Sequence, residues 1–225
     1  MTTAVPAFVM RGCAASAVIA LVLLAPAAAS AAPAGKPRHP APERPRAASQ
    51  RCPSLPSGTA IPPGPPAGLS WQRVGALPVP VAPSAGPTRR TGPAWSCYAH
   101  SPVGAVMAAF GIPAALCGPQ WQAATAREVV PGPGLTAFLA AGASQRYAPP
   151  TAAVARPAGF AVVAYTSEQA TVEVLVPDGR QYAASFRTLA WSGVDWRLVM
   201  LPDGTAGPGP QVLATTAGFT LWGGQ

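Results

Sequence analysis

The sequence predicts an α+β domain in which N-terminal helices pack on a curved antiparallel sheet. Apolar residues recur with helical spacing between residues 102 and 141. From residue 160 onward, β-branched and aromatic residues gather in short runs that alternate apolar and polar positions. Helices followed by closely spaced strands are typical of an α+β layout with the helices on one sheet face.

The helical half begins at Ser101-Pro102, where a hydroxyl residue precedes a proline, as is usual at a helix start. The spacing of the apolar residues that follow predicts one apolar face. Gly111-Ile112-Pro113 predicts a bend or an interruption. We expect a second helix from about Pro119 and a third over residues 135–141. The apolar face of the first helix consists of Val103, Val106, Met107 and Phe110.

The second half predicts an antiparallel meander, because only short turns separate its strands. Turns are expected at Pro177-Asp178-Gly179, Ser192-Gly193 and Pro202-Asp203-Gly204. Before the helices, residues 69–87 contain several prolines, so we expect them to form an extended segment at an edge of the domain. The predicted strands cover residues 160–166, 171–176, 182–191 and 195–201.

Residues 1–31 have the layout of a secretory signal peptide. Arg11 precedes an apolar run, and Ala29-Ser30-Ala31 has the small residues of a cleavage site. A retained membrane anchor over residues 12–32 is the alternative, because about 20 residues suffice to span a bilayer. Both interpretations place the domain outside the cytoplasm, either secreted or anchored to the membrane.

Residues 32–67 predict a disordered linker and residues 68–225 the folded domain. Eleven of the 34 residues from 33 to 66 are proline, which favours an extended tether. The net charge of +8 lies mostly in the leader and the linker. Residues 36–51 therefore predict weak contact with an anionic surface such as lipid or cell-wall polymer. The chain has no zinc-finger spacing and no basic–aromatic platform, which argues against specific nucleic-acid recognition.

The cysteines outside the leader predict one disulfide, between Cys52 and Cys97. Cys97 and Cys117 bracket a helix that would hold them about 30 Å apart, which is too far for a bond. Cys52 lies on the linker and reaches either partner; we prefer Cys97, because this bond pins the linker to the helix start. Closing the 45-residue loop stabilises the fold by about 4 kcal/mol on the chain-entropy model.

Cys97 and His100 also have the residue types of a catalytic or metal-binding pair. A catalytic pair needs a third group that orients the base, and the sequence offers none. The chain lacks zinc-ligand spacing as well. We therefore predict no catalytic residue, no metal and no cofactor. His100 is expected to be a helix-start group or, if a pocket exists, to line it together with Tyr165, Tyr182 and Trp196.

Three motifs resemble an uncharacterised actinobacterial family of secreted or membrane-anchored proteins. They are SCYAHSPVGAVMAAF, WSGVDWRLVML followed by PDG, and AGFTLWGG, similar to the family's CxxHxPxGA, WxGGDWRLV and GFxxWGG. Val194 departs from the family's second glycine. The order of elements also resembles the cystatin-like roll of nuclear transport factor 2-like domains. That resemblance implies a likeness to assembly domains of type IV secretion and conjugation machines.

Two functional hypotheses follow. The first is a non-catalytic binding or assembly domain with a protein partner at the cell envelope, accessory to a conjugation or secretion apparatus. The second is a roll that binds a small ligand, or acts as an isomerase, through a pocket under the sheet. A sealed apolar core favours the first hypothesis, whereas an open pocket with a buried acid or an inward-facing His100 favours the second.

Overall fold

The computed structural model describes residues 52–142 and 154–223. The predicted leader and most of the predicted linker lie outside these residues. The part of the linker that is described, residues 52–67, contains neither helix nor strand and is mostly exposed. The elements are β1 (Ser70–Val74), β2 (Leu77–Val81), α1 (Pro102–Leu116), α2 (Trp121–Glu128), α3 (Pro133–Gly142), β3 (Gly159–Tyr165), β4 (Gln169–Asp178), β5 (Gln181–Trp191), β6 (Trp196–Leu198), β7 (Gln211–Leu213) and β8 (Thr220–Leu221).

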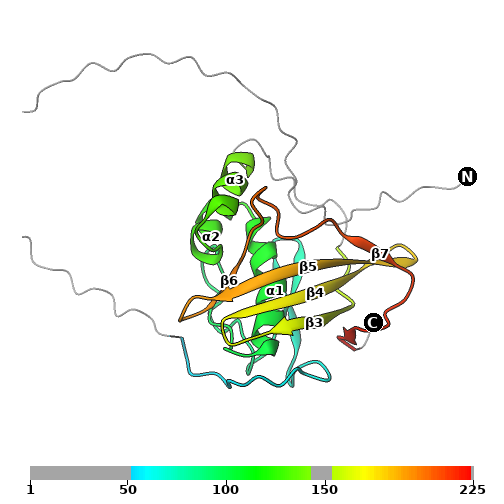
Figure 1. Ribbon diagram of the computed structural model, residues 1–225. Helices are drawn as coiled ribbons and strands as arrows, with labels where there is room; N and C mark the ends of the chain where they lie inside the picture. The colour runs from blue at the N-terminus through cyan, green and yellow to red at the C-terminus, as the bar shows by residue number, and fades with distance from the viewer. Residues whose placement is uncertain (1–51, 143–153, 224–225) are drawn as a thin grey trace, which may run out of the picture. The chain divides into compact units, whose positions relative to one another are not determined.

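The main sheet has the order β6-β5-β4-β3-β8, with β7 also paired to β5 (Figure 1). All of these pairings are antiparallel, and the sheet is open. The α+β class and the meander of β3 to β6 are therefore confirmed. The turn between β4 and β5 lies at Gly179-Arg180, later than predicted, because Pro177 still pairs with Tyr182.

The strand predicted over residues 195–201 is shorter in the structure, where β6 ends at Leu198. Beyond it the chain leaves the sheet, folds a turn closed by a hydrogen bond from Gly204 N to Leu201 O, and rejoins β5 as β7. This excursion lies against α3. A side chain at Gly134 would collide with the backbone of Met200 and Leu201, so this glycine permits the close approach.

Helix α1 is apolar all round rather than on one face. Thirteen of its 15 residues are buried, because the sheet covers one side and the β1–β2 hairpin covers another (Figure 1). The predicted edge segment is thus a hairpin, with the register Ser70–Val81. The helix also continues through Pro113 to Leu116. Near a helix end, a proline removes one intrahelical hydrogen bond, and burial of the helix compensates for that loss.

The connection between α2 and α3 lies along the outer edge of β6. Val129 forms a parallel bridge with Leu198, and Val130 N donates to Leu198 O. These contacts cover backbone groups that would otherwise be exposed at the sheet edge. They also fix the C-terminal end of α2, and with it Glu128, against the core.

Trp222, in the closing GFTLWGG motif, joins the layers of the core. Its ring makes contacts with Trp71 from β1, Phe110 from α1 and Phe160 from β3, at centroid distances of 5.7, 5.5 and 4.7 Å. The side chain is buried. The motif therefore has a packing role in the fold.

Candidate functional site

The residues singled out in the sequence meet at the start of α1, beneath the turn between β5 and β6. Cys97 is bonded to Cys52, with 5.2 Å between their Cα atoms, so the structure contains the predicted disulfide. Cys97 is fully buried, whereas Cys52 is exposed. The bond therefore joins a position within the proline-rich segment to the interior of the domain.

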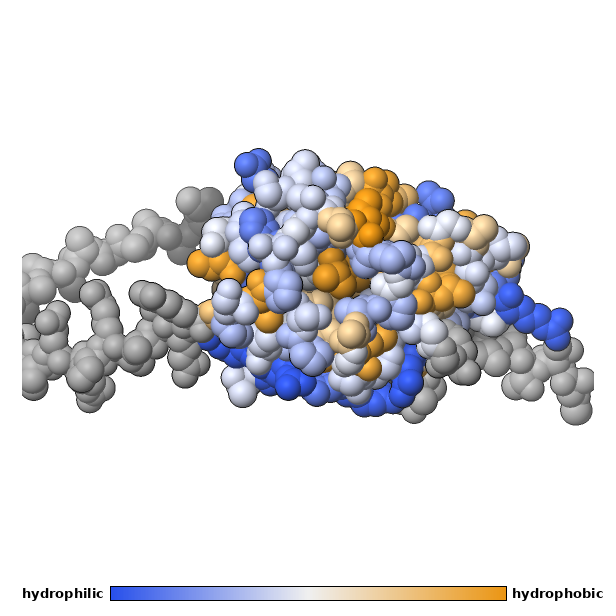
Figure 2. Space-filling view, turned by 90° about the horizontal axis from the view of Figure 1, so that it is seen from below, coloured by the Kyte–Doolittle hydropathy of each residue, from blue (hydrophilic) through white to orange (hydrophobic). Residues whose placement is uncertain are grey.

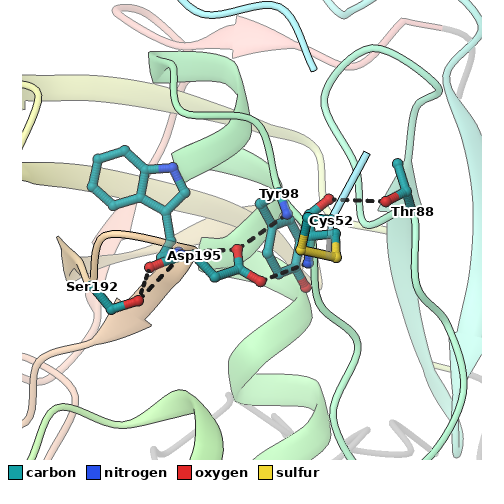
Figure 3. Close-up of a disulfide and its surroundings, with 7 residues drawn as sticks. Cys52, Thr88, Tyr98, Ser192 and Asp195 are labelled. Carbon is teal, nitrogen blue, oxygen red and sulfur yellow. Dashed lines mark hydrogen bonds between the residues drawn. A yellow bond between two sulfur atoms is a disulfide. The ribbon is translucent and has the colours of Figure 1, made fainter. Parts of the chain in front are cut away.

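Asp195 holds this segment from the opposite side (Figure 3). Its carboxylate accepts hydrogen bonds from Cys97 N at 2.6 Å, Tyr98 N at 3.1 Å and Trp196 N at 3.0 Å. Cys97 has a φ of +69°, which is unusual for a residue with a side chain. Adjacent backbone N–H groups that converge in this way form an anion-binding concavity, and here Asp195 fills it.

The sequence around Asp195 explains its position. Ser192 and Asp195 close the turn between β5 and β6: Ser192 N donates to Asp195 O at 2.9 Å, and Asp195 N donates to Ser192 Oγ at 3.2 Å. The turn directs the carboxylate at the start of α1. Burial raises the pKa of Asp195, although the N–H groups of Cys97, Tyr98 and Trp196 oppose that effect.

Two further polar side chains are buried beside this carboxylate. Glu128 is 5% exposed, and neither of its carboxyl oxygens has a hydrogen-bond partner. Burial and, to a smaller extent, the charge of Asp195 raise its pKa to about 9, against the opposing effect of Arg127. Burial also raises the pKa of Tyr98, as do Glu128 and Asp195. At neutral pH, Glu128 is therefore a protonated, uncharged acid.

The hydroxyl of Tyr98 lies against Gly111 of α1, with no hydrogen-bond partner. A Cβ at position 111 would overlap that hydroxyl. Gly111 is thus required for the approach of the tyrosine rather than for a bend in the helix.

His100 lies in a cluster of aromatic rings. It stacks on Trp191, with centroids 4.0 Å apart and planes at 8°, and Trp196 meets its edge at 5.9 Å. His100 Nε2 donates to Ser167 O at 2.5 Å, which requires the tautomer with a proton on Nε2. Trp196 Nε1 donates to Ala99 O at 2.9 Å. Tyr165 completes the cluster at 6.0 Å from Trp196.

Three of the four predicted pocket residues, His100, Tyr165 and Trp196, are therefore neighbours. Tyr182 lies near the other end of β5, in a separate apolar cluster with Leu175 and Leu213. A small cavity of the described residues lies elsewhere as well. It has a volume of about 20 Å³, between β2, α1, β4 and β5, and Arg187 is its one charged lining residue.

Glu128 and Arg187 are the functional candidates that the sequence analysis missed. No sequence pattern predicted the burial of Glu128, since a single acid near the end of a helix is common on exposed surfaces. Arg187 gave a weak signal, because strand alternation places it on the same face as the buried Leu189. Among the described residues, no group of three or more His, Cys, Asp and Glu side chains is arranged to hold a metal ion.

In the portion of the chain that the structure covers, no helix has both the length and the apolar character needed to cross a bilayer. A comparison with curated proteins and one with solved structures found no match. A family described as a domain of unknown function, DUF8175, matches residues 29–221. This match spans most of the sequence, including the first two motifs described above and the beginning of the third, and the chain therefore belongs to the DUF8175 family.

Proposed function

We propose that the protein is an extracytoplasmic, non-catalytic binding or assembly domain that its N-terminal segment holds at the cell envelope. The disulfide is the observation that supports this most. It joins the proline-rich segment, at Cys52, to a buried residue, and Asp195 fixes that residue in turn. Disulfide bonds persist outside the cytoplasm, where the surroundings are oxidising.

Three of the side chains with catalytic potential support the same proposal, because each of these three has a structural role. The sulfur of Cys97 is in the disulfide, His100 is stacked on Trp191 with Nε2 bonded, and Asp195 accepts three backbone N–H groups. A nucleophile and a base need to face a substrate together. These groups instead join α1, β6 and the disulfide.

Exposed apolar side chains are candidates for partner contact. Ile61 is 56% exposed in the proline-rich segment, and Val194 is 68% exposed at the tip of the β5–β6 turn. Figure 2 shows apolar residues in separate groups among hydrophilic ones on the face seen from below. Such a mixed surface is typical of non-obligate protein interfaces. A protein of a conjugation or secretion apparatus at the cell envelope remains our proposed partner.

The proposal is tested in intact cells that express the full chain. A photo-cross-linking residue is placed at Ile61 or Val194, and at Gln181 as an exposed control at the opposite end of β5 from the β5–β6 turn. We expect one discrete adduct with an envelope protein from position 61 or 194 and none from position 181. Recovery of monomer alone from every position would contradict the proposal. The mass of the mature N-terminus separates the secreted form from the form anchored by residues 12–32.

The alternative, a ligand-binding or isomerase-like roll, has one observation in its favour, the cavity at Arg187. None of the residues that line this cavity is an acid or a histidine. Isomerases of this type need a general acid or base within reach of the substrate. The cavity is therefore suited to binding rather than to catalysis.

A further inference from the structure

Arg187 is a buried cation in the middle of the fold. It lies on β5, opposite Val172 of β4, and its side chain is 6% exposed. Arginine keeps its charge in proteins, and burial of a charge without a counter-charge costs several kcal/mol. Arg187 therefore requires compensation from its surroundings.

The described surroundings provide only part of that compensation. Arg187 Nη1 donates to the neighbouring Phe186 O at 2.7 Å, whereas Nε is buried without a hydrogen-bond partner. Burial lowers the pKa of Arg187, and the sulfur of Cys117 is the group that opposes this effect. No carboxylate of the described residues lies in an ion pair with Arg187, and none lines the cavity beside it.

The cavity has the size and lining of a site for a small anion. Its volume is about 20 Å³, and a cavity of this kind holds about one water molecule, or an ion of similar size. A buried water needs two or more polar partners. Here the other lining residues are apolar and include Phe110, Pro113, Val174 and Val176. A monovalent anion in the cavity would instead neutralise the guanidinium directly.

We propose that this cavity binds a chloride-sized monovalent anion through Arg187. The anion takes part in no reaction. It completes the charge balance of the core and links β5 to the C-terminal end of α1. This site is a proposal separate from the envelope function, and neither proposal depends on the other.

The first test uses thermal unfolding of the full chain. The Tm is measured in sodium chloride, sodium bromide and sodium gluconate at equal ionic strength and pH, because gluconate is too large for the cavity. We expect chloride and bromide to raise the Tm by about 3–5 °C for each tenfold increase in concentration above the Kd. Equal Tm values in chloride and gluconate would overturn the proposal, and they would indicate that water or the Cys117 sulfur balances Arg187.

The variants separate this site from general salt effects. Arg187→Gln is expected to lose the chloride dependence, and Arg180→Gln, at an exposed turn, to keep it. If Arg187→Gln does not fold, Arg187→Lys is measured in its place and is expected to bind chloride more weakly. Crystals of the wild-type chain grown in bromide give an independent answer. An anomalous peak between Arg187 and Phe110 supports the site, and its absence refutes it.

Discussion

The two ends of α1 differ in how completely their charges are satisfied. At the N-terminal end, the carboxylate of Asp195 accepts three backbone N–H groups. At the C-terminal end, the guanidinium of Arg187 has one hydrogen bond and an unpartnered Nε. The first end is a completed structural connection, whereas the second has polar groups and space for a ligand.

The comparison also shows where the charges come from. Helix α1 has no acid in its first turn and no basic residue in its last turn. The sheet supplies both, with the negative charge of Asp195 near the N-terminal end and the positive charge of Arg187 near the C-terminal end. This arrangement matches the direction of the helix dipole. A helix buried on both sides thus receives its charge complement from a neighbouring layer.

Removal of the disulfide is expected to have the largest effect on the N-terminal end. The double variant Cys52→Ser, Cys97→Ser should lower the free energy of unfolding by about 4 kcal/mol, because the unfolded chain regains the freedom of the closed loop. Urea unfolding of this variant and of the oxidised wild type measures the difference. Cys117→Ser serves as a cysteine control. Equal urea midpoints for the double variant and the wild type would show that the bond does not stabilise the fold.

Matched substitutions at the two ends should differ in cost. Asp195→Ala leaves the buried N–H groups of Cys97 and Tyr98 unpaired, and should lower the free energy of unfolding by about 3 kcal/mol. Arg187→Met replaces an incompletely paired charge by an apolar side chain, and in chloride-free buffer should leave the free energy of unfolding unchanged or raise it by up to about 4 kcal/mol. Urea unfolding in gluconate compares them, with Asp203→Ala as an exposed control. A larger loss from Arg187→Met than from Asp195→Ala would reverse the comparison.

Glu128 should make stability depend on pH. Its pKa rises from its usual 4.5 to about 9 on folding, so its contribution is fully present below pH 4.5 and is lost as the pH rises to about 9. Between these two pH values, the ionisation of Glu128 lowers the free energy of unfolding by about 1 kcal/mol per pH unit. Glu128→Gln keeps the shape without the titration, so the difference between the variant and the wild type should grow with pH in urea unfolding. A constant difference would mean that Glu128 is ionised in the fold.

Much of the fold could be predicted from local patterns. The helix start at Ser101-Pro102 and the strands of the meander follow from capping and period-two alternation, which act over a few residues. The prediction of a single apolar face for α1 was wrong. Residues 70–81 are extended as predicted, but their pairing as the β1–β2 hairpin was not predicted. The local sequence of α1 did not reveal that the β1–β2 hairpin, which is distant in the chain, covers a second face of this helix. The short strands β7 and β8 also gave too little sequence to detect.

The candidate site could be predicted only in part. Helix geometry argued against a Cys97–Cys117 bond, and Cys97 was the preferred partner of Cys52, with Cys117 as the alternative. The role of Asp195 was not predicted, because its partners, Cys97 and Tyr98, lie 98 and 97 residues away in the chain. Asp195 in a turn and Glu128 in a helix have the sequence pattern of ordinary solvated acids. Their burial depends on how the α2–α3 connection and the β5–β6 turn pack on the start of α1.

The sequence by itself determined the class of the fold, because periodicity is a local property. Proline content predicted the division of the chain, and chain reach favoured the Cys52–Cys97 disulfide. Only the tertiary structure decided which charges are buried and how they are satisfied. Burial arises from contacts between segments far apart in the chain, and it controls the pKa of Glu128 and the charge balance of Arg187. Cys97 and His100 thus have structural roles at one end of α1, and the site that binds a ligand is proposed at the other.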